Sequence, residues 1–332
     1  MTSLYPLLMS PMFDPRPWGT YDLSPIYPNQ QFSEKIGESW LTGDNSKVAN
    51  GPLRGKSLAE LSANYGRELV GIAAKDPNRF PLLLKFLFPN EKLSVQVHPD
   101  DEAALRVGQP CGKTECWYVL HANPGAQVAL GLKPGVTKAS FEEAIHRNAA
   151  EDLLNWIDVF AGDMIYVAGG TVHTLGPGAI IVETQQQSDT TYRLYDYGRP
   201  RELHLRDGLA VLNESARSGK VAYLAAASRP KENYVSRLIT SPCFVVDRFS
   251  LQQSREFATP PGQQNTSVQI LVAIDGFGVV ETEVSEPITF AKGDAVVIPA
   301  SLSKFTVRPQ WKIEFLKSCL PNGKVPEPAL KP

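Results

Sequence analysis

Short apolar segments separated by glycine, proline and aspartate recur along this 332-residue chain and constrain its fold more than any other feature. They include "FPLLLKFLF" (80–88), "ECWYVLH" (115–121), "QVALGL" (127–132), "DMIYVAG" (163–169) and "AIIVETQQ" (179–186). Many short strands with turn signals between them are typical of β-sandwiches and β-barrels. The sequence therefore predicts a mainly β protein.

A few short helices are expected as well. "SLAELSANYGRELVG" begins with Ser57 and Glu60 in capping-box spacing, which predicts a helix over about 57–70. "SFEEAIHRN" repeats that spacing from Ser140, and the apolar residues of "AEDLLNWID" (150–158) are spaced to share one helical face. We therefore expect a second helical segment over about 140–158.

Two segments far apart in the chain resemble each other. "GDMIYVAGGTVHTLG" (162–176) and "GDAVVIPASLSKFTV" (293–307) align without gaps, and His173 of the first falls on Lys304 of the second. The pattern predicts two related barrels, one over 1–230 and a degenerate one over 231–332 that has lost the histidine. The alternative is a chance similarity, because short repeats of this kind arise easily.

Composition excludes several classes of partner. The formal net charge is −2 and no basic stripe is present, so we expect no nucleic-acid partner. No apolar run approaches the roughly 20 residues of a membrane span, and the first residues lack the features of a signal peptide. The four cysteines are scattered, which favours reduced thiols and a cytoplasmic location.

The stretch "LSVQVHPDD" (93–101) is unusual for a strand. Ser94, Gln96 and His98 alternate with apolar residues, so on a strand the three polar side chains share one face. A buried face is a poor place for glutamine and histidine unless a partner satisfies them. We therefore expect this face to meet a polar or charged partner.

Further polar residues on neighbouring strand segments suggest that this partner is a metal ion. Glu115 lies in "GKTECWYVL" and His173 in "GGTVHTLG". Together with Gln96 and His98 they form a set that suits zinc, with manganese, iron or cobalt as lesser options. Only Glu115 offsets charge, so a divalent ion would keep positive charge to polarise a bound oxygen. Each histidine alone would more often be a hydrogen-bonded core residue, and the four together favour a metal site.

The order of these residues resembles the two-part signature of cupins. The first part reads His-x-His followed later by Glu, and here Gln96 replaces the first histidine. The second part reads Gly, five residues, Pro-x-Gly, two residues, His. Gly162, Gly170 and His173 match it, with Ala168 in the place of proline. The resemblance implies a double cupin, that is, two jelly-roll β-barrels with a few short helices.

Within the cupins, the chain resembles the type I mannose-6-phosphate isomerases. The resemblance covers about residues 10 to 320 in the order and compact length of the short bacterial form, and it rests on these motifs: "S-x-Q-x-H-P-D" (94–100), "RPWG" (16–19), "GESWL" (37–41), "GKTECW" (112–117) and "QQQSDTTYRLYDYGR" (185–199). It implies a zinc-dependent aldose–ketose isomerase that interconverts mannose 6-phosphate and fructose 6-phosphate through an enediol. It also implies one zinc ion per chain, bound by Gln96, His98, Glu115 and His173.

The same resemblance implies roles for four further residues. Arg193 matches the catalytic arginine, and Ser94 matches a serine near the substrate phosphate. Lys113 and Asp189 fall in active-site blocks, although the longer eukaryotic members have Lys-Pro-Glu where Thr114 follows Lys113 here. Lys113 could bind phosphate or transfer a proton, and Arg193 could stabilise phosphate or the enediolate. Asp189 could be the base or could orient Arg193.

Other functions stay open at this stage. Arg199 is a weaker phosphate candidate, since an arginine in a turn is more often simply solvated. The chain could isomerise another phosphosugar, or it could be a sugar-binding cupin without catalysis. A metal-dependent dioxygenase is disfavoured because those cupins prefer three histidines and iron. We expect a small sugar phosphate as partner, no membrane association, and a monomer or homodimer.

Overall fold

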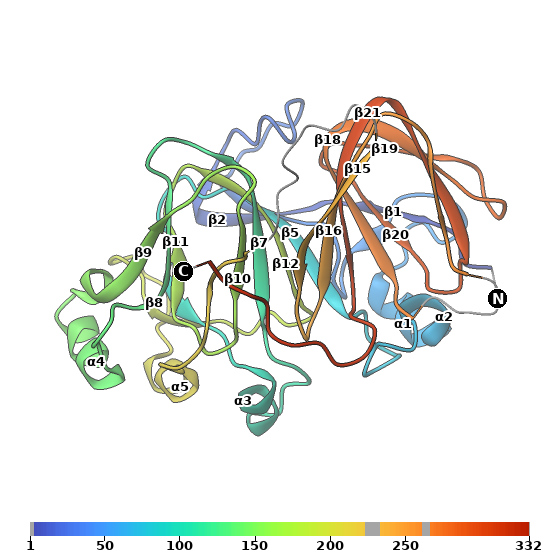
Figure 1. The fold of residues 1–332 in the computed structure, drawn as a ribbon. Helices are drawn as coiled ribbons and strands as arrows, with labels where there is room; N and C mark the ends of the chain where they lie inside the picture. Colours follow the sequence, from blue (N-terminus) through green and yellow to red (C-terminus); the bar gives the residue numbers. More distant parts are fainter. Residues whose placement is uncertain (1–2, 223–232, 261–265, 332) are drawn as a thin grey trace.

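Strands dominate the computed structural model, which describes residues 3–222, 233–260 and 266–331 (Figure 1). The strands form three sheets, and the helices are short and lie outside them. The predicted fold class, mainly β with a few short helices, is therefore confirmed. Among the described helices, none is long and apolar enough to cross a membrane.

The first half of the fold, built from strands between residues 12 and 220, is a sandwich of two antiparallel sheets. The seven-stranded sheet has, in spatial order, β14 (Gly219–Lys220), β10 (Met164–Val167), β7 (Glu115–Ala122), β12 (Ala179–Gln186), β5 (Leu82–Leu87), β3 (Ile36–Trp40) and β2 (Met12–Thr20). The five-stranded sheet has β13 (Tyr192–Tyr195), β6 (Val95–Val97), β11 (His173–Leu175), β8 (Gln127–Leu132) and β9 (Leu154–Asp158). Their facing sides share one buried apolar cluster, to which Trp117, Ile181 and Val128 belong.

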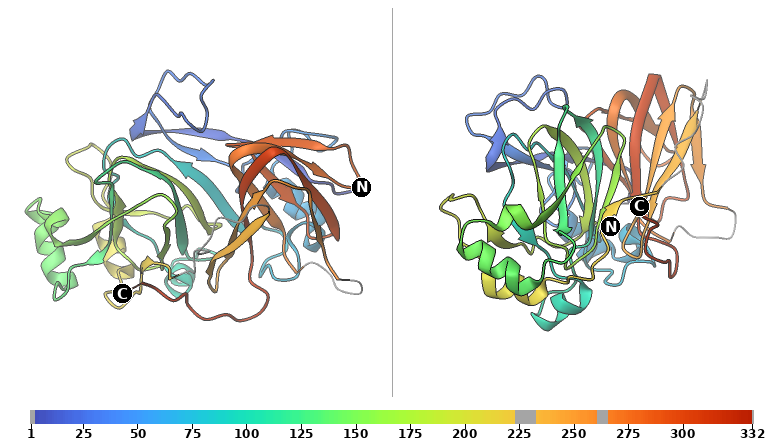
Figure 2. Two further views of the ribbon diagram at one scale, coloured as in Figure 1. Left: turned by 45° about the horizontal axis from the view of Figure 1, so that its top comes forward. Right: turned by 60° about the vertical axis from the view of Figure 1, so that its left-hand side comes forward.

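The second half of the fold, built from strands between residues 234 and 319, contributes most of a nine-stranded sheet. Its main path is β15 (Tyr234–Thr240), β16 (Val245–Leu251), β21 (Lys304–Cys319), β18 (Gln269–Glu281), β20 (Ala295–Ile298), β1 (Leu7–Ser10) and β4 (Lys47–Val48), with β17 (Arg255–Ala258) beside β21 and β19 (Ile288–Ala291) beside β18. One face packs on the seven-stranded sheet, because Phe86 and Tyr118 belong to the same buried cluster as Ile270 and Val297. Figure 2 shows the two halves side by side from two further directions.

Both ends of the chain cross to the opposite half. Strand β1 pairs with β20 in the sheet of the second half. Near the other end, Leu330 forms a bridge with Val221, and Lys331 donates its backbone N–H to Lys220 in the first half. These crossings tie the halves together through backbone hydrogen bonds. The predicted boundary between residues 230 and 231 lies outside the described residues, and the division into two domains remains a prediction.

The first predicted helical segment is present with a break. α1 (Leu58–Tyr65) begins after the N-cap Ser57 with both bonds of the expected capping box, and α2 (Arg67–Val70) follows. Gly66 separates them with a φ of +52°, a conformation that glycine adopts at little cost. The prediction of a helix over about 57–70 is confirmed in its position.

The second predicted helical segment is wrong over half of its length. The N-cap of α4 (Lys138–His146) is Thr137, three residues before the expected cap, and Ser140 stands in the first turn. A short 3₁₀ turn follows (Ala150–Leu153), and 154–158 is strand β9 rather than helix. β9 pairs with β8 and forms the edge strand of the five-stranded sheet. A tertiary hydrogen-bond ladder therefore outweighs the helical spacing of the apolar residues. The other helices are α3 (Asp101–Arg106) and α5 (Leu205–Val211).

The two similar segments form the same turn. Gly162 and Gly293 have φ values of +94° and +95°. The carboxylates of Asp163 and Asp294 accept the N–H of the residue three positions earlier, at 3.0 and 2.9 Å. The turns lead into β10 and β20, respectively. The two segments therefore share a turn geometry, and the internal duplication remains a prediction.

Replacing Gly293 by alanine is expected to destabilise the protein more than replacing Gly55. Both positions have positive φ, which costs a residue with a Cβ about 1–2 kcal/mol. A Cβ at Gly293 would also lie 2.8 Å from Cε1 of Tyr27, whereas nothing lies within 4 Å of a Cβ at Gly55. Overpacking should add about 1–3 kcal/mol at Gly293, measurable as the free energy of unfolding in urea. Equal losses for the two variants would contradict this packing argument.

Candidate metal centre and active-site pocket

The sandwich directs alternate side chains of several strands into one interior. In β5, Leu82, Leu84 and Phe86 pack toward the second half, so Lys85 points to the opposite side, between the two facing sheets. In β7, the same alternation places Glu115 on the side of Trp117, which belongs to the cluster between the sheets. Polar side chains from both sheets therefore converge at one end of an otherwise apolar interior.

Strand register aligns three of the predicted site residues. Gln96 of β6 stands opposite His173 of β11 on one side and opposite Arg193 of β13 on the other. Residues directly opposite each other in antiparallel strands share a face of the sheet. The register therefore places the amide, the imidazole and the guanidinium in one row, although they are up to 97 positions apart in sequence.

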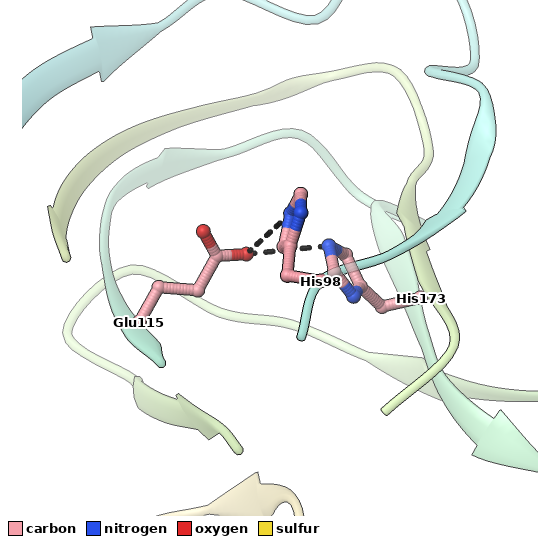
Figure 3. A group of neighbouring side chains, drawn as sticks. All are labelled: His98, Glu115 and His173. Carbon is pink, nitrogen blue, oxygen red and sulfur yellow. Dashed lines mark ion pairs between the residues drawn. The ribbon is translucent and has the colours of Figure 1, made fainter. Parts of the chain in front are cut away.

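His98, Glu115 and His173 form a buried cluster in which the side chains point toward one another (Figure 3). Their candidate ligand atoms all lie within 4.8 Å of one another. The nearer Glu115 oxygen, Oε1, is 3.2 Å from Nε2 of His173 and 3.7 Å from Nε2 of His98. All three side chains are almost completely removed from solvent. The structure thus brings together three of the four predicted metal ligands.

Both histidines have one ring nitrogen occupied by a backbone carbonyl. His98 Nδ1 is 2.9 Å from the oxygen of Thr190, and His173 Nδ1 is 2.9 Å from the oxygen of Thr171. A carbonyl can only accept, so each Nδ1 carries a proton, and each ring turns its Nε2 toward Glu115. Burial and the charge of Lys113 lower the pKa of His98 well below its usual value, which keeps that ring neutral. These are the tautomers that a metal ion requires.

Gln96 reaches the same cluster through its amide. Its Nε2 lies 3.3 Å from Nε2 of His173, and its Oε1 lies 3.4 Å from the hydroxyl of Ser94. A half-turn about the last side-chain bond would exchange the nitrogen and the oxygen. Gln96 is therefore placed to add an oxygen ligand to the two imidazoles and the carboxylate.

The donor set fits a zinc ion. Zinc takes nitrogen ligands at about 2.0–2.1 Å and carboxylate oxygen at similar distances, usually in a tetrahedral arrangement. The spacings of 3.2 and 3.7 Å between Glu115 and the two imidazoles are those of atoms that surround one small ion. Imidazoles whose Nδ1 atoms are held by backbone carbonyls, together with a buried carboxylate, complete the chemical match.

Lys113 also belongs to this cluster. Its Nζ donates to Nε2 of His98 at 2.9 Å and to Oε2 of Glu115 at 3.2 Å, and the side chain is buried. Burial alone would raise the pKa of Glu115, but the charge of Lys113 holds it well below its usual value. Lys113 therefore provides positive charge next to the ligand carboxylate.

A cavity of about 430 Å³ opens beside the cluster. Five of the predicted residues line it, namely Ser94, Gln96, Lys113, Asp189 and Arg193. The lining also includes charged residues that the sequence analysis did not single out, namely Arg16, Glu38, Lys85, Glu183 and Arg201. Arg199, the weaker phosphate candidate, is not among the lining residues and instead pairs with Asp196.

Lys85 is the most buried of these unexpected charges. Its Nζ lies 3.3 Å from Glu38, 3.9 Å from Glu183 and 3.9 Å from Asp189, and 4.2 Å from the centre of the Trp40 ring. Burial opposes the charged form, but these carboxylates raise the pKa of Lys85, so the ammonium is retained. The only sign of this buried charge in the sequence is the single lysine within the apolar run "FPLLLKFLF".

Glu38 and Glu183 are buried carboxyls with opposite behaviour. Burial would raise the pKa of Glu38, but Lys85 and Arg16 lower it to about 2. Burial and the nearby charge of Glu115 raise the pKa of Glu183 to about 8. Trp117 donates its indole N–H to Glu183 at 3.1 Å. The pocket therefore holds one carboxylate that stays ionised and one carboxyl that titrates near neutral pH.

Arg193 is held at the cavity wall by the segment that follows it. Its Nη1 donates to the carbonyl of Glu202 at 2.8 Å, and its backbone exchanges two hydrogen bonds with His204. Its Nε is buried without a hydrogen-bond partner. Among the described residues no carboxylate lies within ion-pair distance of Arg193, whereas Asp189 pairs with Lys85. The structure thus brings Asp189 to Lys85 and does not show it orienting Arg193.

Replacing Glu183 by glutamine is expected to flatten part of the pH dependence of stability in the chelator-treated protein. The pKa of Glu183 is about 8 in the folded protein and 4.5 for a carboxyl that experiences neither burial nor a nearby charge. The folded state therefore binds the proton more tightly than the unfolded state. The stability that the neutral carboxyl supplies is present below about pH 4.5 and lost as the pH rises through about 8. Glu183→Gln, which cannot ionise, should lack this fall in the free energy of unfolding.

The control for this measurement is Glu102→Gln, a change at a side chain that is 84% exposed. It should leave the curve of unfolding free energy against pH parallel to that of the parent. A parallel curve for Glu183→Gln as well would contradict the assignment of the titration to Glu183.

Comparisons with known proteins find relatives along most of the chain. The model of the phosphomannose isomerase type I catalytic domain matches residues 19–112. Mannose-6-phosphate isomerase ManA of Bacillus subtilis is 34% identical over 95% of this chain and 98% of its own length. The Streptococcus mutans mannose-6-phosphate isomerase is 35% identical over 90% of this chain and 94% of its own.

Solved structures show the same fold. The crystal structure of the mannose 6-phosphate isomerase from Bacillus subtilis covers 94% of this chain and 99% of its own, with a TM-score of 0.81 at 32% identity. A zinc-bound mannose 6-phosphate isomerase has a TM-score of 0.71 over 94% of this chain, at 14% identity. Sequence identity above 30% along almost the whole chain, together with this likeness in fold, shows that the chain belongs to the type I mannose-6-phosphate isomerase family.

Proposed function

We propose that this protein is a zinc-dependent isomerase that interconverts mannose 6-phosphate and fructose 6-phosphate through an enediol. The observation that carries the proposal is the buried cluster of His98, Glu115 and His173 beside a cavity lined by charged residues. Membership of the family supports the reaction, and the chemistry of the ligand set supports zinc. A zinc ion on two neutral imidazoles, one carboxylate and the Gln96 amide would keep positive charge to stabilise oxygen atoms that become negative.

Proton transfer needs a group whose pKa lies near the working pH. Isomerisation removes a proton from C2 of the sugar and returns one to C1. Glu183 lines the cavity and has a pKa raised to about 8, so it can both accept and donate a proton near neutral pH. Lys113 and Asp189 remain catalytic candidates. Lys113 is hydrogen-bonded within the ligand cluster, whereas 60% of the Asp189 side chain is exposed and it faces Lys85.

The substrate phosphate needs a cation that is free to bind it. Arg16 pairs with Asp14 and Glu38, Lys85 with Glu38, and Arg201 with Asp196. Arg193 lines the same cavity and, among the described residues, has no carboxylate partner, so its charge is available to an anion. A guanidinium can bind a phosphate or an enediolate through two parallel hydrogen bonds. Ser94, which also lines the cavity, can donate a further hydrogen bond.

Several parts of this proposal go beyond the family assignment. A stoichiometry of one zinc ion per chain, a cytoplasmic location, and a monomeric or homodimeric state remain predictions. Specificity for mannose 6-phosphate over another phosphosugar also belongs to the proposal. The assays below address the metal and the substrate directly.

Removing zinc is expected to abolish conversion of mannose 6-phosphate, and adding zinc back should restore it. The protein would be assayed as isolated, after chelation and dialysis, and after addition of zinc, with metal content measured in each sample. His98→Ala should bind no zinc and show no turnover, while His146→Ala, a change on the exposed side of α4, serves as control. Full activity in a sample shown to be free of metal would refute the proposal. No activity with stoichiometric zinc would favour another phosphosugar or a non-catalytic role.

Arg193→Ala is expected to keep its zinc and to lose turnover. Loss of one group that stabilises developing charge typically costs about 100- to 1,000-fold in rate, and kcat/KM should fall by that order. Arg199→Ala is the matched control, because Arg199 bonds Asp196 and the carbonyl of Lys92 instead of lining the cavity. Similar losses in the two variants would remove Arg193 from its proposed special role.

A further inference from the structure

Three loops that lead to or from the candidate ligands meet beside the cluster. Residues 99–101 follow His98, residues 112–114 precede Glu115, and residues 168–170 precede His173. Lys113 donates its N–H to the carbonyl of Pro99 at 2.9 Å, and Gly170 donates to the carbonyl of His98 at 2.7 Å. The relative positions of the three ligands are therefore set where these loops touch.

Two glycines allow the loops to approach at backbone distance. A Cβ at Gly112 would lie 2.5 Å from the carbonyl carbon of Asp100. A Cβ at Gly169 would lie 2.6 Å from the Cα of the same residue. Because glycine has no side chain at these two points, the loop backbones lie close enough to form direct hydrogen bonds.

Asp101 and Gln186 connect the loop after His98 to β12. One oxygen of Asp101 accepts the N–H of Gly112 at 2.9 Å and the side-chain amide of Gln186 at 2.7 Å. The other accepts from Lys75 at 2.7 Å. Asp101 thus holds two of the ligand-bearing segments against the end of β12.

Gln186 in turn holds Thr114 from two sides. Its side-chain oxygen accepts the N–H of Thr114 at 2.9 Å, and its backbone N–H donates to the carbonyl of Thr114 at 3.2 Å. Thr114 also accepts the N–H of Gly169 through its hydroxyl at 3.2 Å. Its neighbours Lys113 and Glu115 both have their side chains in the ligand cluster. Thr114 is therefore the point at which the loops before Glu115 and before His173 are joined.

We propose that Thr114 is a positioning residue for the metal centre. The hydrogen bond from its backbone N–H to the Gln186 side chain positions Glu115 and Lys113. The hydrogen bond that its hydroxyl accepts from Gly169 positions the loop that carries His173. Gln186 and Asp101 extend the same chain of hydrogen bonds to the loop after His98. Neither bond touches substrate, so the role is to keep the ligands at the spacing that zinc requires. The inference rests on the proposed function for the identity of the metal and the reaction.

The experiment compares zinc affinity in variants that remove the hydrogen-bonding side-chain groups of Thr114 or of Gln186. Thr114→Val keeps the size and the backbone N–H but removes the hydroxyl, and Thr114→Ser restores the hydroxyl. Gln186→Met removes the side-chain oxygen and amide while keeping a similar length. The dissociation constant for zinc would be measured by chelator competition, together with kcat, KM and the urea unfolding curve of the metal-free protein.

Thr114→Val and Gln186→Met are each expected to weaken zinc binding about 10- to 100-fold, the usual effect of removing a group that orients metal ligands. Thr114→Ser should bind zinc as the parent does. At saturating zinc, the two weakened variants should lose kcat with little change in KM, because substrate contacts are untouched. A second variant at a separate residue keeps the test decisive if one of them folds poorly.

Thr184→Val is the matched control. Thr184 is another buried threonine, and its hydroxyl is 3.3 Å from that of Ser318, away from the ligand cluster. It should lose stability without any change in zinc affinity. Parent-like zinc affinity in Thr114→Val and Gln186→Met would overturn the inference, and so would an equal weakening in Thr184→Val. A parent protein that binds zinc but does not isomerise the sugar would refute only the proposed reaction, whereas one that binds no zinc would refute both.

Discussion

The carboxylate of Glu115, which is almost completely buried, is the charge around which the site is built. A buried carboxylate is tolerated only when positive charge and hydrogen bonds compensate it. Lys113 supplies the positive charge, and the two imidazoles stand 3.2 and 3.7 Å away. Burial and this charge together raise the pKa of Glu183 on the neighbouring strand. One buried anion therefore organises both the candidate metal centre and the candidate proton carrier.

The sandwich makes this arrangement possible because alternate side chains of one strand face opposite sides of the sheet. In β5 and β7, one set of alternate residues packs toward the second half, and the other set faces the interior between the sheets. That interior is filled by apolar side chains such as Trp117 and Ile181 and becomes polar only at the end where Lys85, Glu115 and Glu183 converge. Burial there strengthens each electrostatic interaction by excluding water.

Sequence reasoning succeeded where a local pattern carries the information. The polar face of "SVQVH" and the turn chemistry of the Gly-Asp repeat follow from two-residue alternation and from glycine's backbone freedom. It failed for residues 154–158, where pairing of β9 with β8 outweighed a helical spacing. It also passed over Lys85 and Glu183, because one charged residue in an apolar run does not reveal whether it faces solvent or a buried partner.

The sequence by itself determined the chemistry of the site: two imidazoles, a carboxylate, an amide, and an arginine, in an order that resembles one enzyme family. Only the tertiary structure decided which of these groups meet. Strand register brought Arg193 and His173 to opposite sides of Gln96, and the tertiary fold placed Asp189 against Lys85 rather than Arg193. The physical reason is that pairing between distant strands, and the partner that neutralises each charge, depend on contacts far apart in the chain, which no local pattern encodes.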